Sequence, residues 1–415
     1  MIVITLLVFP GCWDRYELEN TVFITSLGVD REPGGELTLT AESTLPQPGG
    51  GAAGPTGGNG TKGPQGVIYQ SSDKTLTAAV GRFQQIIGRK VFLGYVRSIV
   101  IGEDAAREDM TQILGFLDRN PLLRRSSLVL ITPGRASLVL STVVPRKTLV
   151  SEAISLRVAQ TEQTGVSFTT MVGDSIFIPL ATDGLEPIAA RVIATSFPDK
   201  SAGSQGGDGG NTAEMPGNSG TQGEVAQKAG LLRVSGMAVF RETRLVGWLN
   251  EKESRGWGWI RKRVRRGYAV TLTPRSAQGQ LNPVTFHLLG GKSSIKYSID
   301  NDEVAVHVTV NVRGEVAECA TGIDLTDPDI INSLESDLAE EIKSEVEAAL
   351  EKGQRELESD IFGFGFQLFR QHSREWNQEF KDRWPELFPS VPIDVNVNAS
   401  IENTGVVLRA LKIKP

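Results

Sequence analysis

Histidine and cysteine are scarce in this chain of 415 residues. The three histidines, His287, His307 and His372, lie far apart in sequence, which argues against a histidine-rich metal site or a histidine-centred charge relay. The cysteines are Cys12 and Cys319, and no Cys-x-x-Cys pair occurs, which excludes a thioredoxin motif and a zinc ribbon. Basic charge is also low, since the formal net charge is -6, so we predict no nucleic-acid partner.

Motifs typical of enzymes are missing as well. The segment 290–293 resembles the end of a phosphate-binding loop, but Phe286 stands where that loop needs its first glycine. No Gly-x-Ser-x-Gly nucleophile elbow occurs. The acidic residues between 328 and 361 fit a solvated helix face better than an acid/base pair. We therefore predict that the chain is not an enzyme and uses no cofactor and no metal ion.

The apolar run at the start of the chain is too short to span a membrane. Residues 2–9 read IVITLLVF, and eight helical residues rise about 12 Å, against a hydrocarbon core of about 30 Å. A short apolar run followed by Gly11 and Cys12 is typical of a bacterial lipoprotein signal, although Phe9 replaces the usual Leu and no basic residue precedes the run. We predict a signal and lipobox over 1–12, with Cys12 as the lipid attachment residue. The alternative is a buried first strand with an incidental cysteine.

Strand and helix patterns alternate through the first third of the chain. The strand patterns cover 21–30, 36–44, 67–70, 96–101 and 128–131. The helix patterns cover 74–88 and 103–117. This alternation predicts an α/β layer. Two stretches rich in Gly, Ser and Asn cannot bury apolar area and are predicted to be flexible insertions, namely 46–66 and 199–229. A hairpin is predicted after the second insertion, over 231–249.

The last third carries the clearest periodicity. Valines alternate with other residues from Val304 to Val312, which predicts a strand with one buried face. Asp327 and Pro328 then provide the N-cap and first-turn residues of a helix, whose apolar stripe continues to Ile361. Gly353 lies within this helix, so we expect close packing or a bend there. A final strand is predicted over 393–402, on the same sheet.

These patterns predict an α/β (α+β) fold with several domains, built from mixed β-sheets flanked by helices. We expect an N-terminal α/β domain over 13–150 and a middle domain over 151–265, which contains the insertion 199–229. A C-terminal domain over 266–415 would contain the long helix 328–361. Cys319 is expected to be a small buried hydrophobe beside a strand, with a reactive thiol as the alternative.

The densest basic patch follows two tryptophans. Residues 257–266 read WGWIRKRVRR, and the predicted structure is a strand edge with a solvated basic face. The alternative is contact with the headgroups of a membrane surface or a partner, through Arg261, Lys262 and Arg263. Arg119 and Arg125 could likewise form a structural ion-pair network or a partner contact, and the sequence leaves both open.

Several segments together resemble one known family. Residues 11–18 (GCWDRYEL) with 28–30, 98–107 (SIVIGEDAAR) and 116–121 (FLDRNP) resemble the spore-germination lipoproteins. So do 235–240 (SGMAVF) with 245–249, and 360–365 (DIFGFG) with Trp376 and Trp384. These are the Ger(x)C family, the C subunits of nutrient germinant receptors. The resemblance extends over nearly every segment with a strand or helix pattern. This chain departs from it in its lipobox, in Tyr95 where the family often has His, and in the two long insertions.

The resemblance implies a function that the patterns alone do not give. It implies a lipid-anchored, non-catalytic receptor subunit that is needed for the germination response to nutrients. It implies a place on the outer face of the inner spore membrane, beside integral membrane A and B subunits. The fold implied is an elongated set of α/β domains. The alternative function is a surface lipoprotein that binds the germinant itself. We expect Asp360, Phe362, Phe364 and Trp376 to hold the end of the long helix against the C-terminal sheet.

Overall fold

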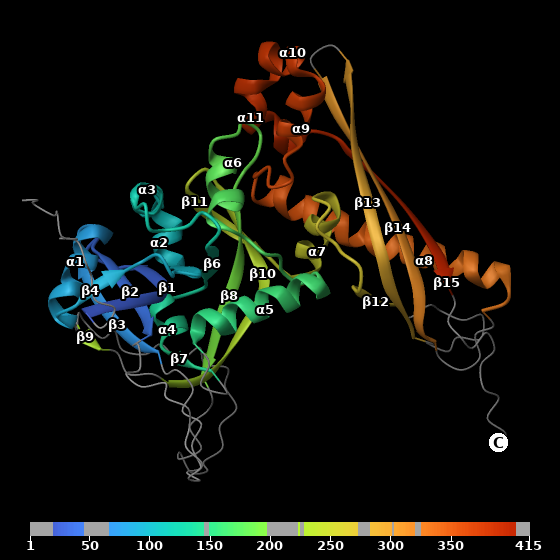
Figure 1. Cartoon of the computed structure of the whole chain (residues 1–415). Helices are drawn as coiled ribbons and strands as arrows, with labels where there is room; N and C mark the ends of the chain where they lie inside the picture. Colours follow the sequence, from blue (N-terminus) through green and yellow to red (C-terminus); the bar gives the residue numbers. More distant parts are fainter. Residues whose placement is uncertain are drawn as a thin grey trace, which may run out of the picture.

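The computed structural model describes residues 20–44, 66–144, 149–196, 223–224, 228–272, 283–300, 303–319 and 325–403. Cys12 and most of the two predicted insertions therefore lie outside the described residues. The described chain forms two sheets, each with its own helices, and α7 and the short helices α9 to α11 lie between them (Figure 1).

The larger sheet contains strands from both sides of residue 150. Its strand order is β11-β10-β8-β6-β5-β1-β2-β3-β9, and β4 pairs with β1 while β7 pairs with β10. Pairing is parallel between β1 and β5, β5 and β6, and β6 and β8, and antiparallel among β1, β2 and β3, so the sheet is mixed. The strands are β1 Thr21–Arg31, β2 Leu37–Thr44, β3 Val67–Asp73, β4 Lys90–Phe92, β5 Ser98–Gly102, β6 Leu128–Thr132, β7 Thr142–Val143, β8 Ile188–Ser196, β9 Gly223–Glu224, β10 Lys228–Arg241 and β11 Arg244–Leu249.

Helices cover both faces of this sheet. Strand β5 is buried along its whole length, as expected of a central parallel strand. Its Ile99 and Ile101 face one apolar core, and Val100 faces the other. The first core is closed by α1 Leu76–Ile87, α2 Glu103–Glu108 and α3 Thr111–Arg119. The second is closed by α4 Ala136–Leu140 and α5 Val150–Thr164.

The helix predicted over 103–117 is interrupted, so that prediction was wrong in detail. Asp109 has an extended backbone and separates α2 from α3. Its carboxylate accepts hydrogen bonds from the backbone N–H and the hydroxyl of Thr111, at 2.9 and 2.6 Å. The hydroxyl of Thr243, in the distant β10–β11 turn, donates to the same oxygen at 2.8 Å. The extended Asp109, held by these three hydrogen bonds, therefore divides the predicted helix into two.

The smaller sheet has the order β12-β13-β14-β15. Its strands are β12 Ala269–Leu272, β13 Val284–Asp300, β14 Glu303–Cys319 and β15 Ile393–Asn403. The valines 304 to 312 are buried in alternation, and β15 pairs with β14 in parallel, which confirms both predicted strands. Helix α8 Pro328–Leu350 continues as the π-helical turn η4 Glu351–Glu356 and lies along this sheet (Figure 1). Asp327 caps it as predicted, since its side chain accepts from the N–H of Asp329.

The long helix ends at Glu356 and not at Ile361. Glu358 has a positive φ of 49°, which turns the chain back on itself. The returning segment then packs on the helix at Gly353, where an added Cβ would lie 2.7 Å from the ring of Phe362. Ile361 is buried in this returning segment and contributes to the same core. The predicted close packing at Gly353 is therefore confirmed.

The tryptophan-rich segment forms a helix, so the predicted strand edge was wrong. Helix α7 Glu251–Ile260 begins with a capping box, in which Asn250 and Glu253 bond each other's backbone N–H groups. Trp257 and Trp259 are buried in the core shared with the smaller sheet. The remaining short helical elements are η3 Val172–Phe177, α6 Ile178–Leu180, α9 Phe364–Gln371, α10 Ser373–Glu375, η5 Trp376–Phe380, η6 Lys381–Arg383, α11 Trp384–Leu387 and η7 Phe388–Ser390.

Candidate functional site

A buried carboxylate organises the turn after the long helix. Asp360 accepts hydrogen bonds from the backbone N–H groups of Gly363, Phe364 and Gly365, at 2.8, 3.0 and 2.8 Å. The indole N–H of Trp384 donates to it at 3.0 Å. Burial raises the pKa of Asp360 to about 6, while these donors act to lower it. The four donors surround both carboxylate oxygens, so this side chain holds the start of α9 in place.

The same turn is bonded to a loop of the larger unit. The carbonyl oxygen of Gly184 accepts from Phe366 N at 2.9 Å, and that of Asp360 accepts from Glu186 N at 3.0 Å. Gly184 has a φ of +71°, and a Cβ there would lie 2.6 Å from the Cα of Gly365. Only glycine combines this conformation with so close an approach. We call residues 182–187 and 359–366 together the joint.

Glu186 adds a second carboxylate to the joint. It accepts from the backbone N–H of Glu242 at 2.6 Å. Burial, and then the nearby negative charge of Asp360, raise the pKa of Glu186 to about 7. The two halves of the molecule therefore meet at the buried Asp360 and the half-buried Glu186, and the pKa of each carboxyl group is raised.

A third buried carboxylate links α7 to α8. Glu345 accepts from Arg255 Nε at 2.6 Å, from Trp259 Nε1 at 2.9 Å and from the Tyr268 hydroxyl at 3.1 Å. The helices can approach this closely because Gly256 has no side chain, and a Cβ there would lie 1.9 Å from the carbonyl oxygen of Glu345. The network satisfies the polar groups of both tryptophan-rich α7 and the long helix, so its role is structural.

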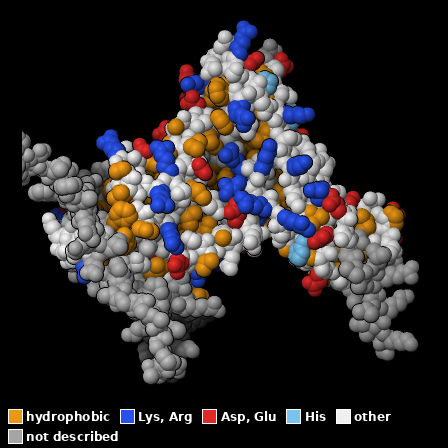
Figure 2. All heavy atoms as spheres, viewed as in Figure 1, with side chains coloured by type: hydrophobic (Ala, Val, Ile, Leu, Met, Phe, Trp, Pro, Cys, Tyr) orange, Lys and Arg blue, Asp and Glu red, His pale blue; other side chains and the backbone are white. Residues whose placement is uncertain are grey.

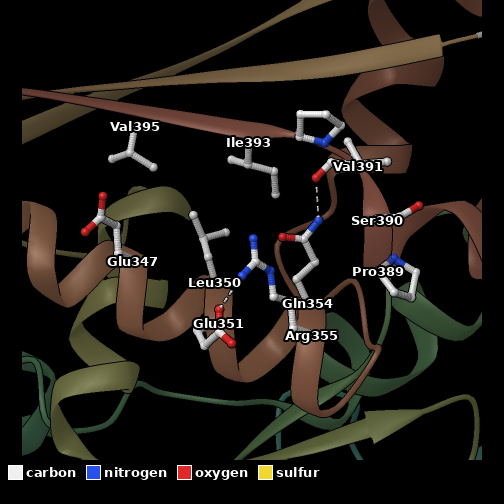
Figure 3. Close-up of a pocket in the computed structure, with 11 residues that line it drawn as sticks. Glu347, Leu350, Glu351, Gln354, Arg355, Pro389, Ser390, Val391, Ile393 and Val395 are labelled. Carbon is white, nitrogen blue, oxygen red and sulfur yellow. Dashed lines mark hydrogen bonds and ion pairs between the residues drawn. The ribbon is translucent and has the colours of Figure 1, made fainter.

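A pocket of about 530 Å³ lies between the end of the long helix and the start of β15 (Figure 3). Buried Gln354 forms its inner wall and donates to the carbonyl oxygens of Phe388 and Val391, each at 2.7 Å. At its rim, Arg355 pairs with Glu351 at 3.1 Å. Apolar side chains complete the wall, and the charged groups stand at the solvent edge, so the pocket can hold a small polar molecule but presents no nucleophile activated by a base.

The sequence-predicted basic residues fall into two separate places. Arg125 is exposed and pairs with Asp118 at 2.6 Å, beside Arg119 in the last turn of α3. Arg261 instead points into the joint, where it donates to the carbonyl oxygen of Phe362 at 3.0 Å and burial lowers its pKa.

In the turn that follows α7, Arg263 is bonded to the protein, whereas Lys262 is exposed to solvent. Arg263 donates to Glu162 and to the carbonyl oxygen of Thr169, at 3.1 and 2.9 Å. Lys262 is exposed. Figure 2 shows Lys and Arg side chains gathered over α7 and β13 on the viewed face. It stays a prediction that a partner or a membrane contacts these basic residues, namely Arg119, Arg125, Arg261, Lys262 and Arg263.

Two further features concern membranes and metals. No helix within the described ranges is long and apolar enough to cross a membrane. Across those same residues, His, Cys, Asp and Glu side chains do not gather in threes around a point where a metal ion could bind. Cys12 lies outside the described residues, and Cys319 is the half-buried last residue of β14, where burial raises the pKa of its thiol.

Two family models match the chain in order along its length. The model described as spore germination protein N-terminal domain matches residues 14–194, and the one described as spore germination B3/GerAC like, C-terminal, matches residues 235–405. The chain is 23% identical over 410 residues to spore germination protein KC of Bacillus subtilis (strain 168), covering 98% of this chain and 95% of that protein. It is 24% identical over 408 residues to spore germination protein B3 of the same organism, covering 97% and 96%.

The fold agrees with a solved structure. The crystal structure of the GerBC protein superimposes with a TM-score of 0.55 at 18% sequence identity, over 91% of this chain and 97% of that chain. Together with the two family models, this places the chain in a defined class of proteins. It belongs to the spore germination B3/GerAC-like family of C subunits, with both the N-terminal and the C-terminal domain of that family. The predicted family and the predicted mixed α/β fold are confirmed.

Sequence reasoning identified one side of the joint and missed the other. Asp360 and the aromatic residues after it stood out as a motif, and the structure places them at the end of the long helix. Gly184 and Glu186 gave no signal, because their role depends on a contact with residues more than 170 positions away. Glu345 was hidden among the other acids of the long helix. The available clue was the position of Glu345 on the apolar stripe of the helix, three residues after Ile342 and four before Ala349.

Proposed function

We propose that this chain is a lipid-anchored, non-catalytic subunit of a spore germinant receptor, needed for the germination response to nutrients. The observation that carries the proposal is the match of both family domains, in order, over most of the chain. The relatives named above are themselves described as spore germination proteins. The lipid would be attached at Cys12, and two acyl chains on one residue suffice for stable anchoring.

A non-catalytic role is supported by how the buried acids are used. Asp360 and Glu345 are each surrounded by hydrogen-bond donors of the protein itself, and neither lines the pocket. Enzymes, in contrast, direct acids of perturbed pKa toward a cleft where substrate binds. We infer that Asp360 helps to fix the relative position of the two halves and that Glu345 holds α7 against the long helix, as a subunit that transmits or scaffolds a signal requires.

The proposed location is the outer face of the inner spore membrane, beside integral membrane A and B subunits of the receptor. Mass spectrometry of Cys12, in protein expressed in a spore former, tests the anchor. We expect a diacylated Cys12, and we expect Cys12→Ala to move the protein from the membrane to the soluble fraction. Cys319→Ser is the matched control, and it should leave the protein in the membrane. An unmodified Cys12 in a protein that still sediments with membranes would contradict the anchor.

A second candidate function is capture of the germinant, and the pocket beside Gln354 favours it. Gln354 is buried and its amide nitrogen is held by two backbone carbonyl oxygens, at the wall of a pocket of about 530 Å³. Polar groups fixed in this way at a pocket wall are typical of sites that select a small ligand. Calorimetry of the isolated protein with candidate nutrients, each tested singly, checks this function. Saturable binding that Gln354→Leu abolishes would favour direct capture over the scaffold role.

A further inference from the structure

A second pocket, of about 330 Å³, lies between α5, β10 and the start of α7. Helix α5 passes β8 and β10 toward α7 (Figure 1), and its Val158 shares a core with Leu232 and Val234 of β10. The pocket lies beside this core, and none of its lining residues belongs to the pocket at Gln354. The two pockets are therefore separate sites.

Arg157 lines this pocket without an acidic partner. Its Nε and Nη1 atoms donate to the carbonyl oxygens of Leu232 and Ala153, at 2.6 and 3.1 Å. Within the described ranges these are its hydrogen-bond partners, and burial alone shifts the pKa of Arg157, which it lowers. A guanidinium has five N–H groups, so donors remain for a ligand after both carbonyl groups are bonded.

The other two charges of the lining neutralise each other. Arg233 pairs with Glu251 at 2.5 Å, and the hydroxyl of Ser235 donates to the same carboxylate oxygen at 2.7 Å. The hydrogen bond from Ser235, and then the one from Arg233, lower the pKa of Glu251, so this acid stays ionised at neutral pH. Arg157 therefore leaves the described lining with a single uncompensated positive charge.

We propose that this pocket binds a small organic carboxylate, whose charged group lies on Arg157 and whose apolar chain lies against Val166, Leu232 and Val234. The planar guanidinium fork matches the two oxygens of a carboxylate. Gln160, which also lines the pocket, supplies an amide donor on the same helix. This binding site goes beyond the proposed receptor role and does not depend on the lipid anchor.

Two features of the lining select a monocarboxylate over an inorganic anion. Arg157 alone neutralises one negative charge, whereas the second charge of a phosphate dianion would be repelled by the ionised Glu251. The apolar residues of the lining also favour a ligand that carries a short hydrocarbon chain. A free acid and the C-terminus of a polypeptide share this chemistry, and the experiment below separates these two sources.

Calorimetry of the full-length protein with butyrate tests the proposal. Butyramide has nearly the same shape without the charge, and phosphate has the charge without the hydrocarbon chain. We expect saturable binding of butyrate, and binding of butyramide and of phosphate that is weaker by about tenfold or more, because hydrogen bonds between charged groups are the stronger ones. Absence of saturable butyrate binding, or equal binding of butyramide or phosphate, would overturn the proposal.

A charge added at an exposed position tests the site without disturbing the bonds of Arg157. Gln160→Glu places a carboxylate three residues after Arg157 on the same helix, where it competes with the ligand, and should abolish butyrate binding. Gln163→Glu is the matched control, because it adds the same charge one turn further along, at an exposed residue outside the lining. Equal effects of the two variants would contradict the assignment of the site.

Removal of the guanidinium gives a second test. Arg157→Gln should weaken butyrate binding by about tenfold or more, while Arg355→Gln, in the pocket at Gln354, should leave it unchanged. Unchanged binding by the Arg157→Gln protein would also overturn the proposal.

A short peptide that ends in a free valine carboxylate identifies the source of the ligand. Its C-terminal amide is the control and should bind about tenfold more weakly. Tighter binding of the free peptide than of butyrate assigns the pocket to the chain end of a protein partner, and weaker or equal binding assigns it to a free acid. Both results support a carboxylate site, whereas equal binding of the peptide and its amide contradicts it.

Discussion

Gly184 gives the sharpest test of the joint between the two halves. A methyl group at this position lies 2.6 Å from the Cα of Gly365 and 2.7 Å from the backbone nitrogen of Phe366. Backbone atoms cannot move aside as the end of a flexible side chain can. Gly184→Ala must therefore separate the two loops and stretch the hydrogen bond from Phe366 N to Gly184 O, which is 2.9 Å long.

The expected loss has three parts. An alanine with φ near +71° costs about 1 kcal/mol relative to glycine. Overpacking costs about 1 to 3 kcal/mol more, and a weakened hydrogen bond adds about 1 kcal/mol. We expect Gly184→Ala to lower the free energy of unfolding by about 3 to 5 kcal/mol. Gly88 is the matched control, because its φ is +66° and a Cβ there meets no atom within 4 Å. Gly88→Ala should cost only about 1 kcal/mol.

Urea unfolding of the two variants measures this difference directly. The expected result is a loss for Gly184→Ala that exceeds the loss for Gly88→Ala by 2 kcal/mol or more, with early protease cleavage between the two halves. Equal losses in the two variants would show that only backbone strain matters at Gly184, and would refute the close contact at the joint.

Two further predictions concern Glu186 and Glu345. Burial raises the pKa of Glu186 from its ordinary 4.5 to about 7, so the folded state holds this proton more tightly than the unfolded state does, and stability falls as pH rises from 4.5 through 7. Glu186→Gln should therefore raise the free energy of unfolding above that of the wild type at pH 8, by at most about 3 kcal/mol, and the difference should vanish near pH 4.5. A difference of the same size at both pH values would contradict the assignment. Glu345→Gln leaves the guanidinium of Arg255 without its buried partner and should cost about 3 kcal/mol in urea unfolding. Glu347→Gln, on an exposed face of the same helix, should be nearly neutral, and equal effects would refute the network.

The elements predicted correctly are those whose signal is local. The alternating valines of β14, and the Asp327–Pro328 start of α8, depend on residues a few positions apart, and both appear as expected. The break after Asp109 and the helix α7 were missed, because each depends on a distant partner. Thr243 bonds the Asp109 carboxylate, and the long helix covers the α7 tryptophans.

The same distinction applies to the site. The motif beginning at Asp360 was visible in the sequence, but its partner loop around Gly184 was not, because nothing local specifies a contact across that separation. The predicted domain limits at residues 150 and 265 stay predictions. The larger sheet joins strands from both sides of the first limit.

The central claim is that the anchored chain is needed for germination in response to nutrients. Spores that lack the wild-type chain and carry instead the Cys12→Ala variant, or the Cys319→Ser control, can be exposed to nutrients while the fall in optical density is followed. We predict that Cys319→Ser restores the wild-type response and that Cys12→Ala does not. A normal nutrient response from spores whose only copy is the soluble Cys12→Ala protein would contradict the account.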